Sequence, residues 1–256
     1  MINNSFDDKS KAIVNPDQTI KEEEKQIAAN VTIDTFIIVF SHQLIDLLFK
    51  NNKIEIIDPN LTIGSAAFKN HIYKIPNSNT GVVLSGIGAP MAVAIVEELN
   101  VLFNAKNYIV FGSCGALFDI AEGKLIVIDE AYRDEGTSYH YIQASDYIKI
   151  KTANALTKIL DELEIEYVVG KSWTTDAFYR ETENNKTKRV KEGCICVEME
   201  CSALQAVCDF RGLNLYQFVY AADSLNEKWA RRILGNLEKD ARLLYFNVAK
   251  KIAEKI

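Results

Sequence analysis

The sequence predicts a single α/β domain in which helices cover a central β-sheet. Three short runs are almost wholly apolar and rich in β-branched and aromatic residues, as in strands buried on both faces: residues 35–40, 108–111 and 215–222. Segments with apolar residues at helical spacing follow or separate these runs. Strands that alternate with helices along one chain are typical of an α/β fold.

The composition is that of a soluble globular protein and argues against several classes of function. The chain has 256 residues, of which 48% are hydrophobic and 25% charged, with a formal net charge of −6. It contains no basic cluster, so we expect no nucleic-acid partner. The N-terminal segment has no secretory apolar region, and no apolar run reaches the about 18 to 20 residues of a membrane span. We therefore expect a cytoplasmic protein without membrane contact.

The cysteine pattern predicts buried thiols rather than a metal site. The chain has five cysteines, an odd number: Cys114, Cys194, Cys196, Cys201 and Cys208. The last four lie within fifteen positions of one another. Their spacing matches no common zinc motif, and no histidine lies near them. We expect small buried side chains in a reducing compartment and no bound metal.

The chain is predicted to consist of an N-terminal arm and one folded domain. Residues 1–30 are expected to form a mobile arm with a charged run at 21–25, and residues 31–256 one folded domain. Ser41 follows the first apolar run and is placed to cap the next helix. Residues 53–84 are strand-like and broken by turn residues, which indicates a small antiparallel meander.

Glycine-containing turns follow two of the predicted strands. Gly86 and Gly88 precede a helix at about 91–104, and Gly112 and Ser113 follow the strand at 108–111. Free backbone N–H groups at the start of a helix favour an anion. A strand–helix–strand crossover predicts adjacent parallel strands, whose turns open at one edge of the sheet. That edge is where α/β proteins bind ligands.

The second half continues the alternation. The predicted elements are strands at 125–128, 167–170 and 193–197, a helix at 152–164, an aromatic loop at 172–181, and a closing helix from Trp229 to Ile256. Gly212 is placed to end the helix that runs to Arg211. Asp223 directly follows the last predicted strand, at 215–222. An acidic residue at this position suits either a catalytic acid or a helix cap.

The triplet Glu198-Met199-Glu200 lies between a short apolar strand and an amphipathic helix. Acidic residues at a helix start complement the positive end of the helix dipole. The triplet is therefore interpreted either as a helix start or as part of a binding site, and both interpretations can hold together.

Four stretches, in this order, resemble the nucleoside phosphorylase family, which includes purine nucleoside phosphorylases, uridine phosphorylases and methylthioadenosine/adenosylhomocysteine nucleosidases. They are residues 86–90, 112–115, 197–200 and 222–224. The resemblance covers about residues 34–250. It implies a single three-layer domain around a mixed, partly barrel-like central sheet, with residues 31–256 as the catalytic domain and a homodimer or hexamer as the assembly.

The resemblance also implies a role for each site residue. Asp223 would be the acid that protonates N7 of a purine leaving group. The ribose site would hold Glu200 on the 2′ and 3′ hydroxyls, Met199 beneath the sugar, and Glu198. The base site would contain Phe178, Arg180 and Ser224. Phosphate or the attacking water would meet Ser113, Gly86, Gly88, Gly112 and Arg133. Neither a cofactor nor a metal is implied, and phosphate is the co-substrate.

Two arginines of the phosphorolytic family pattern are missing. Ile45 and Val110 stand near these positions, and Ser41 replaces the glycine of the first loop. Arginine is the natural bidentate partner of phosphate, so Arg133 and Arg180 are the candidate substitutes from other loops.

Three functions remain open. The first is a phosphorylase that cleaves a purine or uridine nucleoside with phosphate to ribose 1-phosphate and free base. The second is a hydrolytic nucleosidase of the same family that uses water. The third is a non-catalytic protein that binds a nucleoside.

Overall fold

The computed structural model describes residues 6–65, 68–226, 230–231 and 239–256. The strands are β1 Thr35–Val39, β2 Glu55–Ile56, β3 Thr62–Ser65, β4 Phe68–His71, β5 Tyr73–Lys74, β6 Thr80–Leu84, β7 Asn107–Ala116, β8 Leu125–Asp134, β9 Tyr147–Lys149, β10 Tyr167–Thr175, β11 Cys194–Glu198, β12 Asn214–Ser224 and β13 Ala230–Arg231. The helices are α1 Pro16–Thr19, α2 Glu22–Ala29, α3 His42–Lys50, α4 Ala89–Phe103, α5 Ala153–Glu162, α6 Glu183–Lys191, α7 Cys201–Arg211 and α8 Lys239–Ala253, with short 3₁₀ helices η2 Ser138–His140 and η3 Phe178–Arg180.

Five strands close into a small mixed barrel. Strand β7 pairs with β12 in parallel, β12 with β8 antiparallel, and β8 with β10 in parallel. Strand β11 pairs with β10 in parallel and returns antiparallel to β7, which closes the ring. The predicted mixed, barrel-like α/β fold is confirmed.

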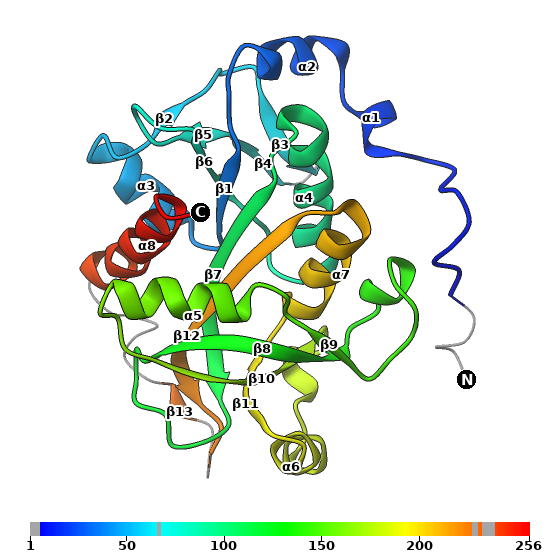
Figure 1. Cartoon of the computed structure of the whole chain (residues 1–256), viewed down its shortest axis with the longest axis vertical. Coiled ribbons are helices and arrows are strands. Elements are labelled where there is room, and N and C mark those ends of the chain that lie inside the picture. Colours follow the sequence, from blue (N-terminus) through cyan, green and yellow to red (C-terminus); the bar gives the residue numbers. More distant parts are fainter. Residues whose placement is uncertain (1–5, 66–67, 227–229, 232–238) are drawn as a thin grey trace.

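The first half of β7 also pairs with β1, and the second half of that edge pairs with β11. From β1 an open sheet continues in the order β7-β1-β6-β5-β2. In Figure 1, β7 runs through the centre of the molecule and joins this upper sheet to the lower barrel. Strands β6 and β7 are both parallel to β1, which lies between them. The predicted adjacency of β6 and β7 is therefore wrong, because β1, whose five residues are all buried, occupies the central position.

Helices cover both faces of the sheet. Along β1 the side chains alternate: Ile37 and Val39 pack into the core beneath α3, α5 and α8, and Phe36 and Ile38 into the core beneath α4 and α7. Figure 1 shows α3 and α8 on one side of β7, and α4 and α7 on the other. A strand with two buried faces needs apolar residues at every position, as the sequence of β1 predicted.

The helix ends follow the predicted capping chemistry. The side chain of Ser41 accepts a hydrogen bond from the backbone N–H of Leu44 at 3.3 Å at the start of α3. Gly212 ends α7 in the left-handed conformation, with φ of 67°. The five cysteines are all buried and form no disulfide.

Several strands are longer than predicted. Strand β7 continues through the expected turn at 112–116, and β10 continues into the expected loop at 172–175. Closure of the barrel supplies pairing partners for these segments, which periodicity within a single strand cannot reveal. The extended ends carry the polar side chains that line the cavity described below.

The chain ends show a further difference. Residues of the expected arm form α1 and α2, and Ala28 is buried in the core beneath α4. The domain boundary at residue 30 stays a prediction. Helix α8 begins at Lys239, and the predicted start at Trp229 lies outside the described residues. No helix of the described ranges is long and apolar enough to span a membrane.

Candidate active site

A cavity of about 560 Å³ opens among the ends of the barrel strands. Its walls come from the loops after β1 and β6, the second half of β7, the η3 segment, the β11–α7 junction and β12. It is lined by Phe40, Ile87, Gly112, Ser113, Cys114, Gly115, Phe178, Tyr179, Glu181, Val197, Glu198, Met199, Glu200, Gln217, Val219, Asp223 and Leu225.

The structure brings most of the candidate residues together in this cavity. Segments far apart in the chain contribute Gly112, Ser113, Phe178, the triplet 198–200 and Asp223. Four others do not line it: Gly86, Gly88, Arg180 and Ser224. Arg133 also lies elsewhere.

Glu198 is a buried anchor for the start of α7. Its Oε2 accepts hydrogen bonds from the backbone N–H groups of Glu200 at 2.8 Å and Cys201 at 2.7 Å. Its Oε1 accepts from the hydroxyls of Ser172, at 3.1 Å, and Thr174. Burial raises the pKa of Glu198, and these four hydrogen bonds oppose that shift. The helix-start interpretation therefore holds for Glu198.

Glu200 occupies a different environment at the same junction. It is 8% exposed, and its Oε1 accepts a hydrogen bond from the backbone N–H of Gly88 at 2.7 Å. Burial, followed by the negative charge of Glu198, raises the pKa of Glu200 to about 8. Gly88 has φ of 99°, a conformation that favours glycine, and it precedes α4. Gly88 therefore does not line the cavity, but it donates a hydrogen bond to Glu200, which does.

Asp223 reaches the cavity through an irregularity of β12. The pairing with β7 shifts between Ala221 and Asp223, so that Asp223 lies opposite Gly115. A Cβ atom at Gly115 would lie 2.4 Å from a methyl carbon of Leu225 and 2.9 Å from one of Val197, so a larger residue there would displace these side chains. Successive strand residues face opposite ways, which explains why Ser224 points away from the cavity that Asp223 lines.

Arg133 does not supply a cation to this cavity. Its Nε donates to the hydroxyl of Ser138 at 2.8 Å, and its terminal nitrogens donate to the carbonyls of Gln143 at 2.8 Å and Ile142 at 3.4 Å. The guanidinium also lies 4.3 Å from the ring centre of Tyr139. The loop after β8 folds over Arg133 and satisfies its donors, which leaves the side chain 2% exposed.

The aromatic end of the cavity comes from η3. Phe178 is 47% exposed, and its ring centre lies 4.9 Å from that of Tyr179. Arg180, the next residue, is exposed and faces outside the lining. A partly exposed aromatic face at the rim of a cavity can stack on a flat ring.

Glu181 and Gln217 line the cavity but were not among the predicted site residues. Glu181 is half-buried, and burial followed by the negative charge of Asp223 raises its pKa to about 7. Gln217 is 2% exposed and lies within the apolar strand β12. A lone amide within a buried apolar strand is a sequence signal, because burial of an unpaired amide is unfavourable.

The lining of the cavity is acidic. Among its described lining residues, four are carboxylic and none is lysine, arginine or histidine. Ile45 and Val110, which stand near the positions of the family's arginines, are buried in the two apolar cores.

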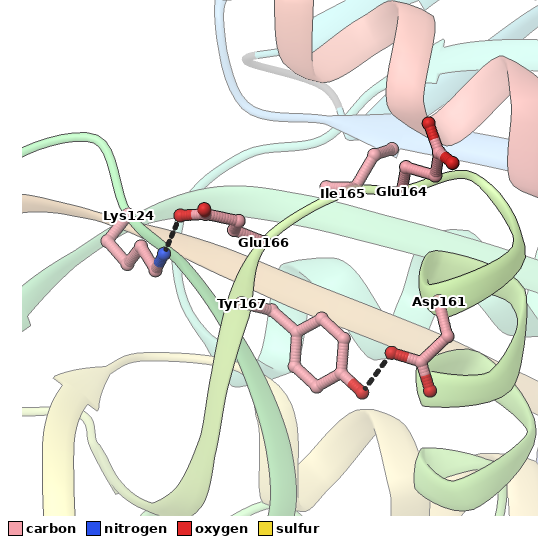
Figure 2. A pocket seen from close by; sticks show the side chains of 6 residues that line it. All are labelled: Lys124, Asp161, Glu164, Ile165, Glu166 and Tyr167. Atoms are coloured by element: carbon pink, nitrogen blue, oxygen red, sulfur yellow. Dashed lines mark hydrogen bonds and ion pairs between the residues drawn. The ribbon is translucent and has the colours of Figure 1, made fainter.

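A second hollow lies on the surface away from this site (Figure 2). It measures about 660 Å³ and is lined by Lys124, Asp161, Glu164, Ile165, Glu166 and Tyr167. Its polar groups satisfy one another: Lys124 pairs with Glu166 at 2.6 Å, and the Tyr167 hydroxyl donates to Asp161 at 2.8 Å. The lining of this hollow includes none of the predicted site residues, which supports the first cavity as the candidate active site.

The match to a known family spans both the barrel and the cavity. The family model described as the phosphorylase superfamily matches residues 35–245. The chain belongs to the phosphorylase superfamily. This finding confirms the family that the four motifs predicted. Members of the superfamily are enzymes that include phosphorylases and nucleosidases. Membership alone therefore does not determine whether the nucleophile is phosphate or water.

Individual relatives are similar over part or most of the chain. The purine nucleoside phosphorylase DeoD-type 1 of Shewanella oneidensis is 34% identical over 140 residues, 52% of this chain and 58% of that protein. The chain thus spans little more than half of this superfamily relative.

Solved structures extend the similarity of the fold. The Campylobacter jejuni 5′-methylthioadenosine/S-adenosyl homocysteine nucleosidase superposes with a TM-score of 0.69 at 22% identity, covering 88% of this chain and 100% of that one. The uridine phosphorylase of Vibrio fischeri gives a TM-score of 0.68 at 22% identity, covering 89% and 94%.

Proposed function

We propose that this protein cleaves the bond between the ribose and the base of a purine nucleoside in the cavity at the barrel end. The observation that carries the proposal is that two carboxyl groups from different elements line one cavity. Glu200 lies at the β11–α7 junction, and Asp223 near the end of β12 beside the aromatic residues of η3. A base stacked near Phe178 would meet Asp223, and the sugar would meet Glu200 and Met199.

The chemistry of Glu200 suits a positively charged transition state. Cleavage of an N-glycosidic bond develops positive charge on the sugar, as in glycoside hydrolysis. A carboxyl group whose pKa is about 8 is largely protonated at neutral pH. Positive charge nearby favours its ionised form, so Glu200 would interact more strongly with the transition state than with the ground state.

Asp223 would supply the proton to the leaving base. A purine leaves more readily when N7 is protonated, and a carboxylic acid within hydrogen-bond reach can supply that proton. Glu181 lies close enough to Asp223 for their charges to interact. The pKa of Glu181, raised to about 7, allows Glu181 to hold a proton beside Asp223 near neutral pH.

Phosphorolysis, the first predicted reaction, is supported by the purine nucleoside phosphorylase among the relatives. Ser113 and the backbone of Gly112 would then meet the phosphate. Hydrolysis is the second candidate, and the acidic lining favours it because none of the described lining residues is basic.

The expected homodimer or hexamer, and the cytoplasmic location, stay predictions.

Base release from purine and pyrimidine nucleosides, measured with and without phosphate, tests the proposal. We expect free purine base in every active reaction. Ribose 1-phosphate as the second product would support phosphorolysis, and free ribose would support hydrolysis. Binding of nucleosides without release of base would contradict catalysis and support the non-catalytic alternative.

A further inference from the structure

Gln217 is a buried polar side chain that the described structure leaves unsatisfied. It is 2% exposed and stands in the apolar strand β12, between Tyr216 and Phe218. Its Oε1 has no hydrogen-bond partner among the described residues. Buried side-chain amides are normally hydrogen-bonded, so an unpaired one that lines a cavity can take a bound molecule as the partner that the described residues do not provide.

The unsatisfied amide lines the cavity. Gln217 and Val219 are both lining residues, two positions apart on the same face of β12. In the parallel pairing with β7, Gln217 lies opposite Val110 and Val219 opposite Gly112. The amide therefore stands beside Val110, where the family resemblance leads one to expect an arginine.

Gln217 and Asp223 both line the cavity and are separated along β12. Six positions of β12 separate them, and a strand rises by about 3.3 Å per residue, so their Cα atoms are up to roughly 20 Å apart. A displacement at the sugar carbon requires the nucleophile on the side opposite the leaving base. If the base lies at Asp223, the nucleophile enters from the side of Gln217.

We infer that Gln217 binds the attacking oxygen, and that this oxygen belongs to water. This inference rests on the proposed N-glycosidic cleavage and adds the nucleophile to it. A neutral amide offers one acceptor and two donors, which match a water molecule. A phosphate dianion would instead face the acidic lining without a described basic partner.

The balance of the step follows from this placement. One lone pair of the water oxygen forms the bond to the sugar carbon, and the electrons of the broken bond go to the base. Asp223 gives its proton to the base, and the proton lost by water returns to a carboxylate of the lining. The products are free ribose and free base, with no oxidant or reductant required.

The test compares Gln217→Leu with Gln205→Leu as a matched control. Gln205 is also a buried glutamine with an unpaired Oε1, but it lies on α7 outside the cavity, with its amide nitrogen 2.7 Å from Asp209. Initial rates of base release from adenosine and inosine are measured with and without inorganic phosphate, together with the melting temperature of each variant.

We expect Gln217→Leu to lower kcat by at least about tenfold, with the nucleoside KM changed by less than about threefold. The native protein should release base and ribose without phosphate, and Gln205→Leu should keep native kcat. The melting temperature of Gln217→Leu should not fall, because no described residue loses a hydrogen bond to Oε1. Gln217→Met, which is unbranched like glutamine, replaces the leucine variant if leucine disturbs packing.

Two results would overturn the inference while leaving the cleavage proposal intact. These are strict dependence of base release on phosphate, and native kcat in both Gln217 variants. Absence of base release from every nucleoside by the native protein would overturn both proposals.

Discussion

The backbone N–H of Gly88 donates a hydrogen bond to Glu200 Oε1 at 2.7 Å, across 112 positions of the sequence. This contact joins the loop before α4 to the start of α7. It fixes one oxygen of the Glu200 carboxyl group at the wall of the cavity. The positive φ of Gly88 allows its N–H to point there without strain.

The raised pKa of Glu200 predicts a pH dependence of stability. The folded-state pKa is about 8 against an ordinary value of 4.5, so the folded state binds the proton more tightly. The resulting stabilisation is present below the unfolded pKa and is lost as pH rises through about 8. Glu200→Gln keeps an acceptor for Gly88 and removes this titration.

We therefore expect Glu200→Gln to become more stable than the native protein as pH rises. The difference in free energy of unfolding should grow between about pH 5 and pH 9 to the order of a few kcal/mol. Urea unfolding at several pH values measures it. Parallel pH profiles for the two proteins would show that Glu200 is not perturbed by folding.

Loss of the Glu198 carboxylate should destabilise the fold. Its two oxygens accept four hydrogen bonds, two of them from backbone N–H groups at the start of α7. Glu198→Ala leaves these donors unpaired, which should cost about 3 kcal/mol of unfolding free energy. Denaturant unfolding checks this, with the exposed Glu183 changed to alanine as the control. An equal, small effect of both substitutions would rule out the anchoring role.

The pKa of Glu181 should depend on the charge of Asp223. The charge of Asp223 is the second cause, after burial, of the Glu181 pKa of about 7. Asp223→Asn removes that charge, so the pKa of Glu181 should fall partway towards its ordinary value. Carbon-13 NMR of the side-chain carboxyl groups measures this change. An unchanged Glu181 titration would mean that the two groups do not interact.

Asp223→Asn should affect purine nucleosides more than pyrimidine nucleosides. Removal of a general acid typically lowers the rate by about 10² to 10⁴, and only a purine offers N7 to this acid. Values of kcat/KM for both classes measure the difference. Asp161→Asn, in the surface hollow of Figure 2, serves as the control. Equal losses on purines and pyrimidines would argue against protonation of N7 by Asp223.

The strands and most helix ends could be predicted because their signals are local. The fully apolar β1 and the caps at Ser41 and Gly212 depend on residues close in sequence. The position of β1 between β6 and β7 could not be predicted, since pairing order depends on contacts between distant segments. The mixed barrel followed from the family resemblance rather than from periodicity.

The site was predicted in part for the same reason. Asp223 and Glu200 lie next to strand ends, which sequence patterns locate. Arg133 also follows an apolar run, but its donors are satisfied by residues of the following loop, and no spacing rule reveals that. Gln217 was detectable as a lone amide in an apolar strand, and its significance depends on the cavity that it lines.

The most direct test of the proposed site is kcat/KM for purine nucleosides in Glu200→Ala and in the native protein, with melting temperature measured in parallel. We predict a loss of about 10²-fold or more, because the carboxylate interacts most strongly with the charged transition state. The melting temperature should fall by only a few degrees, because the substitution removes one hydrogen bond, the one from the backbone N–H of Gly88. Native kcat/KM in a folded Glu200→Ala variant would contradict the assignment of this cavity as the active site.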